Sequence, residues 1–442
     1  MNRTREKLKT VLICLLLVGM VYLTYSVWFF DSPLGEMKIE DLFNVSDTQK
    51  TSNAAGEDLS HYGIRPLSIA VRENGECRAI LYDGAALEGA YKKLRDGIAS
   101  AFERGREIKT VSDKEWRDAL SKDGVFLDYS GNIPIEALKL WLGEENGEDT
   151  TCGQYFLFST SARTVKVYIK NTETQRVYLM ETSSTSETLK KALSEIAATP
   201  AEFALLSETD FSAVNPEMLI PEELIKPAAV SSYNIYTAFE ADTVAACLEC
   251  FKLRNTASSS YTEKDGTQVY ITDMVSMKIS PTGIVSYTDL RDEADEALGI
   301  KINSDEEELT FAERCEAARG VVASLAKKVS GSGQIYILHA GGDANSAEII
   351  FGCHINGIPV NMKETPYFAR VTVKKNSIGE VRMNLSGYEV SAQTMEMLPA
   401  RLAAAAVSQT GTVNTLSLRY GHTDDGKIAP LWFVNGTEKG EG

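Results

Sequence analysis

The stretch VLICLLLVGMVYLTYSVWFF, residues 11–30, contains no charged residue and no proline. As an α-helix these 20 residues would rise about 30 Å, which matches the hydrocarbon thickness of a bilayer. Residues 1–10, MNRTREKLKT, carry four basic residues and one acidic residue, and such a positive excess favours the cytoplasm. We therefore expect a cytoplasmic N-terminus over 1–10 and a transmembrane helix over 11–30, with the rest of the chain extracellular.

A cleaved signal peptide is the alternative for this stretch. Such a peptide has a shorter apolar core and a cleavage site of small residues. Here the long run ends in Trp28, Phe29 and Phe30, followed by Asp31-Ser32-Pro33. The aromatic cluster suits the outer membrane interface instead. Because no later stretch is long and apolar enough to span again, we predict a single-pass protein of the cell membrane with a retained anchor.

The composition limits the kinds of partner that the chain can bind. Its 442 residues carry a net charge of −17 and are 43% hydrophobic, which is enough for several folded domains. An acidic exterior argues against nucleic acid and against docking on anionic lipid. Six of the seven cysteines lie beyond the anchor. Six cysteines allow 15 pairings, and buried free thiols remain an alternative to disulfides.

The extracellular part divides by composition into a tether and three units. Within the tether, residues 31–60, the stretch NVSDTQKTSNAAGEDLS has too little apolar surface to order itself. We expect an N-terminal α+β domain over 61–225, a middle domain over 226–308 and a C-terminal α+β domain over 309–442. Two prolines in PEELIKPAAV and the acidic stretch DLRDEADEALGIKINSDEEE mark the boundaries.

Alternating strands that meet at tight turns recur through all three units. Turns are predicted at Asn74-Gly75, at Ser280–Gly283 and at Asn376–Gly379, and strands joined in this way are antiparallel. Helical spacing of apolar residues occurs between many of these hairpins, and Thr310 with Glu313 forms a capping-box pattern at the start of one helix. We therefore predict an α+β fold, a multi-domain ectodomain of antiparallel sheets with helices packed on them.

Signatures of catalysis or cofactor binding are largely missing. The sequence has no G-x-S-x-G, P-loop, HExxH or dinucleotide fingerprint. Ser324 and Lys327 form a bare S-x-x-K, which we interpret as chance. Cys247 and Cys250 form a C-x-x-C, a pattern of redox pairs and zinc sites, but Cys247 falls on the apolar face of a predicted helix, which favours the core. We predict no catalytic, cofactor-binding or metal-binding residues.

The few histidines leave one alternative function open. His61, His339, His354 and His422 share no ligand-like spacing. His339, His354 and Cys353 are nevertheless close enough in sequence to allow a pocket around them. A wall-facing solute-binding protein or enzyme with a site near His339 and His354 is therefore the alternative to a non-catalytic protein, and a structural scaffold of the division machinery is a third possibility.

The order of short motifs along the chain resembles that of the YycH family of membrane-anchored regulators from Gram-positive bacteria. Besides the basic N-terminus and the anchor, the matching stretches are VFLDYSGNIPIEAL (125–138), FKLRNTASSSYTEKDGTQVYI (251–271), VSYTD (285–289), FGCHINGIPVN (351–361) and RYGHTDDGKIAPLWFV (419–434). The resemblance implies a protein that is not an enzyme. It implies an accessory regulator that sits beside a WalK (YycG) type sensor histidine kinase, together with a YycI-like protein, and tunes the kinase through membrane-helix contacts.

One face of the anchor is the candidate partner contact. Gly19, Tyr22 and Ser26 fall at i, i+3 and i+7 and so share one helix face. Small and polar residues are the ones that allow helices to pack closely in lipid. The alternative is that all three are ordinary residues of a membrane helix, since no second glycine completes a GxxxG pair.

Overall fold

The computed structural model describes residues 64–436, apart from 145–146, 148, 210, 212, 239, 254–258, 273, 292–308, 344, 376, 410–413 and 424–426. By internal contacts the chain divides into Met1–Asp58 and Leu59–Gly442, and every element described below belongs to the second unit. The predicted cytoplasmic segment 1–10, transmembrane helix 11–30 and tether 31–60 lie outside the described residues. Among the helices that are described, none has the length and apolarity needed to cross a membrane.

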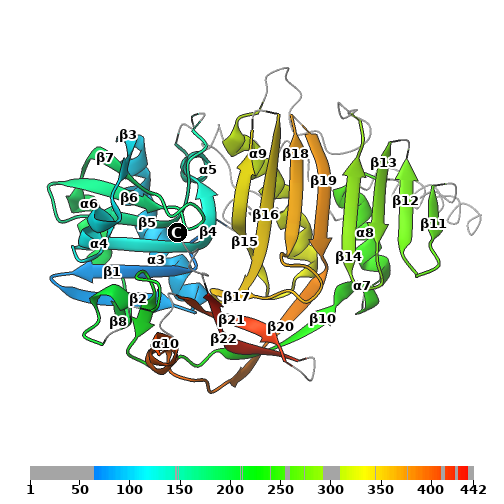
Figure 1. Ribbon diagram of the computed structural model, residues 1–442. Coiled ribbons are helices and arrows are strands. Elements are labelled where there is room, and N and C mark those ends of the chain that lie inside the picture. Colours follow the sequence, from blue (N-terminus) through cyan, green and yellow to red (C-terminus); the bar gives the residue numbers. More distant parts are fainter. Residues whose placement is uncertain are drawn as a thin grey trace, which may run out of the picture. The chain divides into compact units, whose positions relative to one another are not determined.

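Two large sheets and the helices packed on them make up the described chain (Figure 1). The α+β class predicted from the sequence is therefore confirmed. The helices are α3 (Gly84–Glu103), α4 (Asp113–Leu120), α5 (Ile135–Leu142), α6 (Ser186–Ser194), α7 (Ile235–Ala238), α8 (Glu240–Cys250), α9 (Phe311–Val329) and α10 (Ala400–Ser408), with a 3-10 turn at Ala204–Leu206.

The first sheet has nine strands in the order β3-β7-β6-β5-β4-β1-β2-β8-β9. Every neighbouring pair in it is antiparallel, as expected for strands joined through tight turns. Its strands are β1 (Ser68–Glu73), β2 (Glu76–Leu81), β3 (Gly105–Val111), β4 (Gly124–Pro134), β5 (Cys152–Ser159), β6 (Thr164–Lys170), β7 (Val177–Thr185), β8 (Thr199–Phe203) and β9 (Leu219–Pro221).

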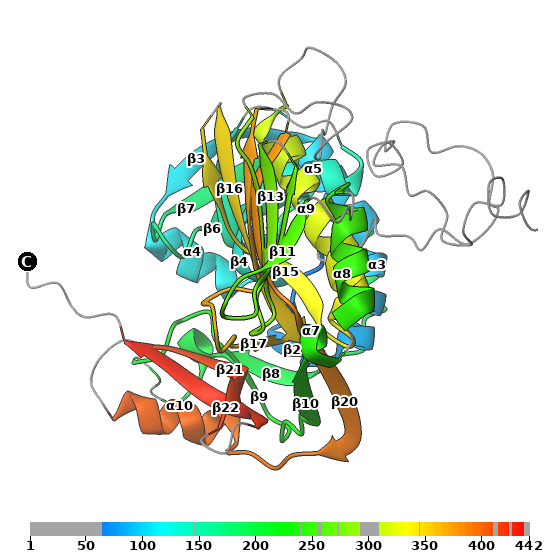
Figure 2. The ribbon, with the colours of Figure 1, turned by 90° about the vertical axis from the view of Figure 1, so that its right-hand side faces the viewer.

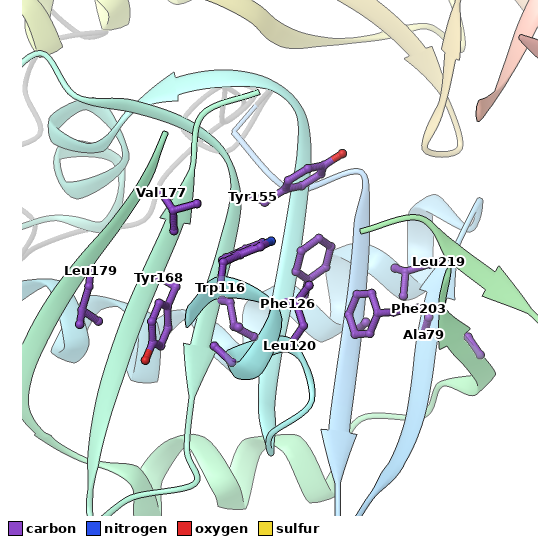
Figure 3. Close-up of a cluster of buried hydrophobic side chains, with 14 residues drawn as sticks. Ala79, Trp116, Leu120, Phe126, Tyr155, Tyr168, Val177, Leu179, Phe203 and Leu219 are labelled. Carbon is purple, nitrogen blue, oxygen red and sulfur yellow. The ribbon is translucent and has the colours of Figure 1, made fainter. Parts of the chain in front are cut away.

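Both faces of this sheet are buried, which explains the nearly continuous apolar runs of β4 and β5. On one face, Phe102 of α3 meets Phe156 and Phe158 of β5 edge to face. On the other face, Trp116 and Leu120 of α4 join an aromatic cluster with strand residues (Figure 3). The central strands of the first sheet therefore lie between α3 on one face and α4 on the other, with apolar side chains packed on both faces.

The second sheet has thirteen strands, in the order β11-β12-β13-β14-β19-β18-β16-β17-β21-β22-β10-β20, with β15 paired to β16. All of its ladders are antiparallel except β17–β21, which is parallel. Its strands are β10 (Ala228–Asn234), β11 (Ser260–Thr262), β12 (Gln268–Thr272), β13 (Val275–Ile279), β14 (Ile284–Asp289), β15 (Gln334–Gly342), β16 (Ser346–Ile355), β17 (Ile358–Val360), β18 (Ala369–Lys374), β19 (Ser377–Asn384), β20 (Ser386–Thr394), β21 (Asn414–His422) and β22 (Ile428–Gly436).

Helix α9 is the central helix of the second core. It packs against β15, β16 and β18 of the sheet and against α5 and α8, and α8 and α9 lie on the same face of the sheet (Figure 2). The predicted capping box forms, because Thr310 and Glu313 each accept the other's backbone N–H. Burial extends around the helix beyond the predicted apolar stripe and includes Arg314, Glu316 and Arg319.

The structure contains elements that the sequence pattern did not predict. Strand β3 and helix α4 occupy the interval between helix α3 and strand β4, and β8 follows α6. Strand β3 is polar and pairs only at the sheet edge, so it lacks the apolar alternation that identifies a strand. Helix α4 is short, with only three buried residues.

The division into domains 61–225, 226–308 and 309–442 stays a prediction. The structure adds that the thirteen-stranded sheet contains strands from both later segments, because β14 pairs with β19 and β10 pairs with β20. These ladders join the two segments through backbone hydrogen bonds. Strand β15 also packs beside β4 of the first sheet.

Candidate ligand cavity

A cavity of about 610 Å³ lies where the nine-stranded sheet meets the hairpin β21–β22. The ends of β4, β5 and β6 and the loop before β9 form one wall, and β17, β21 and β22 form the other. Its volume is in the range of pockets that enclose small organic ligands. The cavity therefore unites residues from both ends of the described chain.

Helix α10 and the segment before β9 hold the two walls together. Ala403, Ala404 and Val407 of α10 pack with Ile220 of β9 and Leu416 of β21 in one buried cluster. Small alanine side chains let the helix approach this surface closely. The hairpin β21–β22 is thereby fixed against the first sheet through apolar contacts, which leaves the cavity between them.

A buried ion pair forms part of the cavity wall. Lys170, at the end of β6, and Glu217, in the loop before β9, are 6% and 3% exposed at their side chains, and Nζ lies 2.5 Å from Oε1. The indole N–H of Trp116 donates to the same oxygen at 2.8 Å. The two charges neutralise each other, and the additional hydrogen bond offsets part of their desolvation.

A second carboxylate, Asp128 of β4, is only partly satisfied. Its Oδ1 accepts hydrogen bonds from the backbone N–H of Ser130 at 2.7 Å and from the Gln154 amide at 3.0 Å. The orientation of Gln154 is set by Thr172, whose hydroxyl donates to the Gln154 carbonyl oxygen. No side chain in the described part of the chain forms an ion pair with Asp128, and its Oδ2 has no hydrogen-bond donor there. The pKa of Asp128 is raised to about 6, mainly by burial and to a smaller extent by the nearby Glu217, against the lowering effect of the two hydrogen bonds and of the Arg419 charge.

Arg419 of β21 supplies the opposite charge from the other wall. Its Nε donates to the Ser417 hydroxyl at 3.1 Å and its Nη1 makes a long contact of 3.4 Å to Asn361. Within the described ranges, no carboxylate forms an ion pair with this guanidinium. Arg419 influences Asp128 electrostatically, so one unpaired cation and one unpaired carboxylate share the cavity.

The remaining surface of the cavity combines apolar and polar side chains. Leu81, Met218, Leu219, Leu416 and Trp432 contribute to the apolar part. The indole N–H of Trp432 is directed to the Leu398 carbonyl at 2.8 Å, which fixes the ring. Convergent charged groups on an apolar background are the usual composition of a ligand site.

The structure separates the two histidines that the alternative function placed together. His354 is 2% exposed, and its Nδ1 accepts the backbone N–H of Gly357 at 3.2 Å. Burial, with a smaller effect of Arg65, lowers the pKa of His354 to about 3, so the ring stays neutral in the core. His339 is half-buried and lies 2.8 Å from Glu173. Neither histidine lines the cavity, and Cys353 is a buried thiol beside His354.

The cysteines of the described chain are free thiols. Cys247 is fully buried on α8, as its place on an apolar helix face suggested. Cys250 lies 3.6 Å from the hydroxyl of Ser324, which in turn donates to the Val321 carbonyl. Ser324 of the S-x-x-K pattern is thus part of the contact between α8 and α9. The described residues contain no cluster of three or more His, Cys, Asp or Glu that could hold a metal ion.

The partner-contact residues predicted in the anchor, Gly19, Tyr22 and Ser26, lie outside the described residues, as does His61. The charged residues of the cavity were not predicted. Asp128 stands between apolar and aromatic residues in VFLDY, which was the only local signal for any of them. Lys170, Glu217 and Arg419 sit in sequence surroundings that do not distinguish them from ordinary surface charges.

Comparisons with known proteins identify the fold. The crystal structure of YycH from Bacillus subtilis superimposes with a TM-score of 0.51, over 87% of this chain and 98% of that chain. The fold is YycH-like. Sequence identity to that protein is only 14%, so the likeness is one of architecture. No family model matches the chain, and no curated protein matches it in sequence. The YycH-like fold agrees with the resemblance seen in the order of sequence motifs.

Proposed function

We propose that this chain is a membrane-anchored accessory regulator of a two-component sensor histidine kinase of the WalK (YycG) type, with no catalytic activity of its own. The observation that carries the proposal is the YycH-like fold, which extends over nearly the whole of the Bacillus subtilis YycH chain. The basic N-terminus and the apolar stretch 11–30 support an anchor with an extracellular domain. The partners in this proposal are the kinase and a YycI-like protein.

The first experiment tests the partner. The full-length chain with an affinity tag is purified from detergent-solubilised membranes, and the proteins that accompany it are identified by mass spectrometry. A sensor histidine kinase enriched over a tagged, unrelated single-pass protein supports the proposal. Recovery of no histidine kinase in several detergents and after chemical crosslinking would contradict it.

A second experiment tests the anchor face. Helices in lipid approach closely where a small residue faces the partner, so Gly19→Leu should separate the helices and uncouple the regulator from the kinase. Leu16→Ile, which conserves volume on the same helix, is the matched control. Kinase-dependent reporter output is measured at equal membrane levels of each protein. Equal output from both variants and the wild type would exclude Gly19, and with it the face shared with Tyr22 and Ser26, from the contact.

A further inference from the structure

The charge inventory of the cavity defines what it can bind. Lys170 is paired with Glu217 within the wall, and its Nζ also lies 3.6 Å from Oδ1 of Asp113. Asp128 keeps one carboxylate oxygen without a donor, and Arg419 has no carboxylate partner within the part of the chain that the structure describes. An occupant that satisfies both must carry one cationic and one anionic group. A ligand with a single charged group would leave one of these two charges partly buried without a partner, and a ligand with no charged group would leave both. Burial of an unpaired charge is costly.

The two unpaired groups are held in place by the fold. Asp128 is fixed by the turn that its own Oδ1 makes with Ser130 and by the chain of hydrogen bonds through Gln154 and Thr172. Arg419 is fixed through Ser417 on the same strand. Because each group is positioned before a ligand arrives, little conformational entropy is lost on binding.

The volume and the apolar lining indicate the rest of the ligand. A cavity of about 610 Å³ is larger than a single amino acid requires and lies within the range that encloses drug-sized molecules. Met218, Leu416 and Trp432 offer apolar surface beside the charged groups. A body of one or two apolar side chains between the two charged ends would fill this space and release water from it.

We propose that the cavity binds a short zwitterionic peptide of two or three residues, whose terminal ammonium pairs with Asp128, whose terminal carboxylate pairs with Arg419 and whose side chains lie against Trp432 and Met218. A guanidinium can bind a carboxylate through two parallel hydrogen bonds, and a carboxylate accepts strongly from an ammonium group. The proposal goes beyond the regulatory function and does not depend on it, because binding is measured without a kinase.

The test is calorimetric titration of the purified full-length chain in detergent. The probes are alanyl-leucine, its N-acetyl derivative, which lacks the ammonium charge, and its C-terminal amide, which lacks the carboxylate. We expect alanyl-leucine to bind, and each capped probe to bind at least tenfold more weakly. A loss of this size is ordinary for removal of one partner from a buried charged pair.

Two variants assign each end of the probe to a residue. In Asp128→Asn, alanyl-leucine should bind at least tenfold more weakly, and N-acetylation should cost nothing further. In Arg419→Gln, alanyl-leucine should also bind at least tenfold more weakly, and the C-terminal amide should bind no more weakly than alanyl-leucine. Glu249→Gln, on the exposed pair with Lys328, is the matched control and should bind like the wild type. An unchanged thermal transition confirms that each variant is folded.

Three binding results would overturn the peptide proposal. Absence of binding by alanyl-leucine and by trialanine at 10 mM would overturn the proposal. Equal affinity of the wild type for alanyl-leucine and for both capped probes would overturn it as well, because the charges would then play no part in recognition. So would a fall in affinity that is the same for all three probes in both variants, because neither residue would then recognise one particular end of the peptide. None of these results would bear on the interaction with a kinase, which the co-purification tests separately.

Discussion

Trp141 of α5 donates its indole N–H to Glu316 of α9 over 2.6 Å, although 175 residues separate the two in the sequence. The same carboxylate receives two hydrogen bonds from Arg319, at 2.7 and 2.6 Å, and the Arg319 side chain is 2% exposed. The Glu316–Arg319 pair of α9 is thus bidentate and buried, and the Glu316 carboxylate also binds the indole of α5. This arrangement joins α5, beside the first sheet, to the central helix of the second core.

Removing the Glu316 carboxylate should destabilise the protein strongly. In Glu316→Gln the Arg319 guanidinium loses its buried bidentate contact with a carboxylate, and breaking a buried pair in this way costs about 3–5 kcal/mol. Urea unfolding of the full-length chain in detergent measures the loss. Trp141→Phe removes only one donor to a charged acceptor and should cost about 1.5–3 kcal/mol.

The matched control for this prediction is Glu249→Gln. Glu249 pairs with Lys328 of the same helix α9 over 2.9 Å, but both side chains are well exposed. Exposed pairs contribute roughly 0–1 kcal/mol. If Glu316→Gln were no more destabilising than Glu249→Gln, the buried pair would not stabilise the contact between α5 and α9.

Gly131 should not tolerate a methyl group. A Cβ at this position of β4 would overlap the carbonyl oxygen of Ile337 and crowd the backbone of Leu338, both in β15. Since backbone cannot move aside cheaply, Gly131→Ala should cost about 3 kcal/mol, at the upper end for overpacking. Gly89→Ala is the control, because a Cβ at this exposed position of helix α3 meets nothing within 4 Å. That change should stabilise by about 0.5–1 kcal/mol. Similar unfolding midpoints for the two variants would contradict the close approach of β4 and β15.

His354 should make the protein sensitive to acid. Its pKa in the folded protein is about 3, below the ordinary value of 6.5, so the unfolded chain binds the proton more tightly between these values. Its contribution is therefore fully present above pH 6.5 and is lost as the pH falls toward 3. Between pH 7 and pH 5 the loss is about 2 kcal/mol.

The comparison that isolates this effect uses His354→Asn. Asparagine places an amide oxygen near the position of Nδ1, where it can accept the N–H of Gly357, and it does not titrate in this range. The difference in unfolding free energy between pH 7 and pH 5 should be smaller in the variant by about 2 kcal/mol. Other groups, Asp128 included, are the same in both proteins, so their titration cancels. Parallel pH profiles would show that the pKa of His354 is the same in the folded and the unfolded protein.

The cysteines at positions 77, 152, 247, 250, 315 and 353 should all be alkylated after unfolding without any reductant, because they are free thiols in the structure. In the folded protein alkylation should be slow, since burial raises the pKa of Cys77 to about 11 and of Cys152 to about 12. Mass spectrometry counts the modified thiols in each state. A count that rises only after reduction would reveal a disulfide.

The antiparallel hairpins, the helix that became α9 and the α+β class were predictable because each depends on local pattern. Alternation around Ser280–Gly283 predicted the turn between β13 and β14, where the N–H of Gly283 donates to the carbonyl of Ser280. Strand β3 and helix α4 were missed because one is polar at a sheet edge and the other is short. Their places are determined by the surfaces they cover, which the local sequence does not contain.

The charged residues of the cavity could not be predicted from the sequence. Asp128, Lys170, Glu217 and Arg419 are scattered over nearly 300 residues, and no spacing relates them. Conversely, His339 and His354 marked the alternative site in the sequence, yet His354 is buried in the core and neither histidine lines the cavity.

The sequence by itself determined the alternation of strands, the turns, the caps and the order of motifs that resembles the YycH family, because hydrogen bonding and apolar periodicity act over a few residues. Only the tertiary structure decided that β15 lies against β4, that Glu316 is shared by α5 and α9, and that one carboxylate and one guanidinium face a common cavity. These relations depend on burial and on distances through space, and a linear pattern of residues encodes them only through the whole fold.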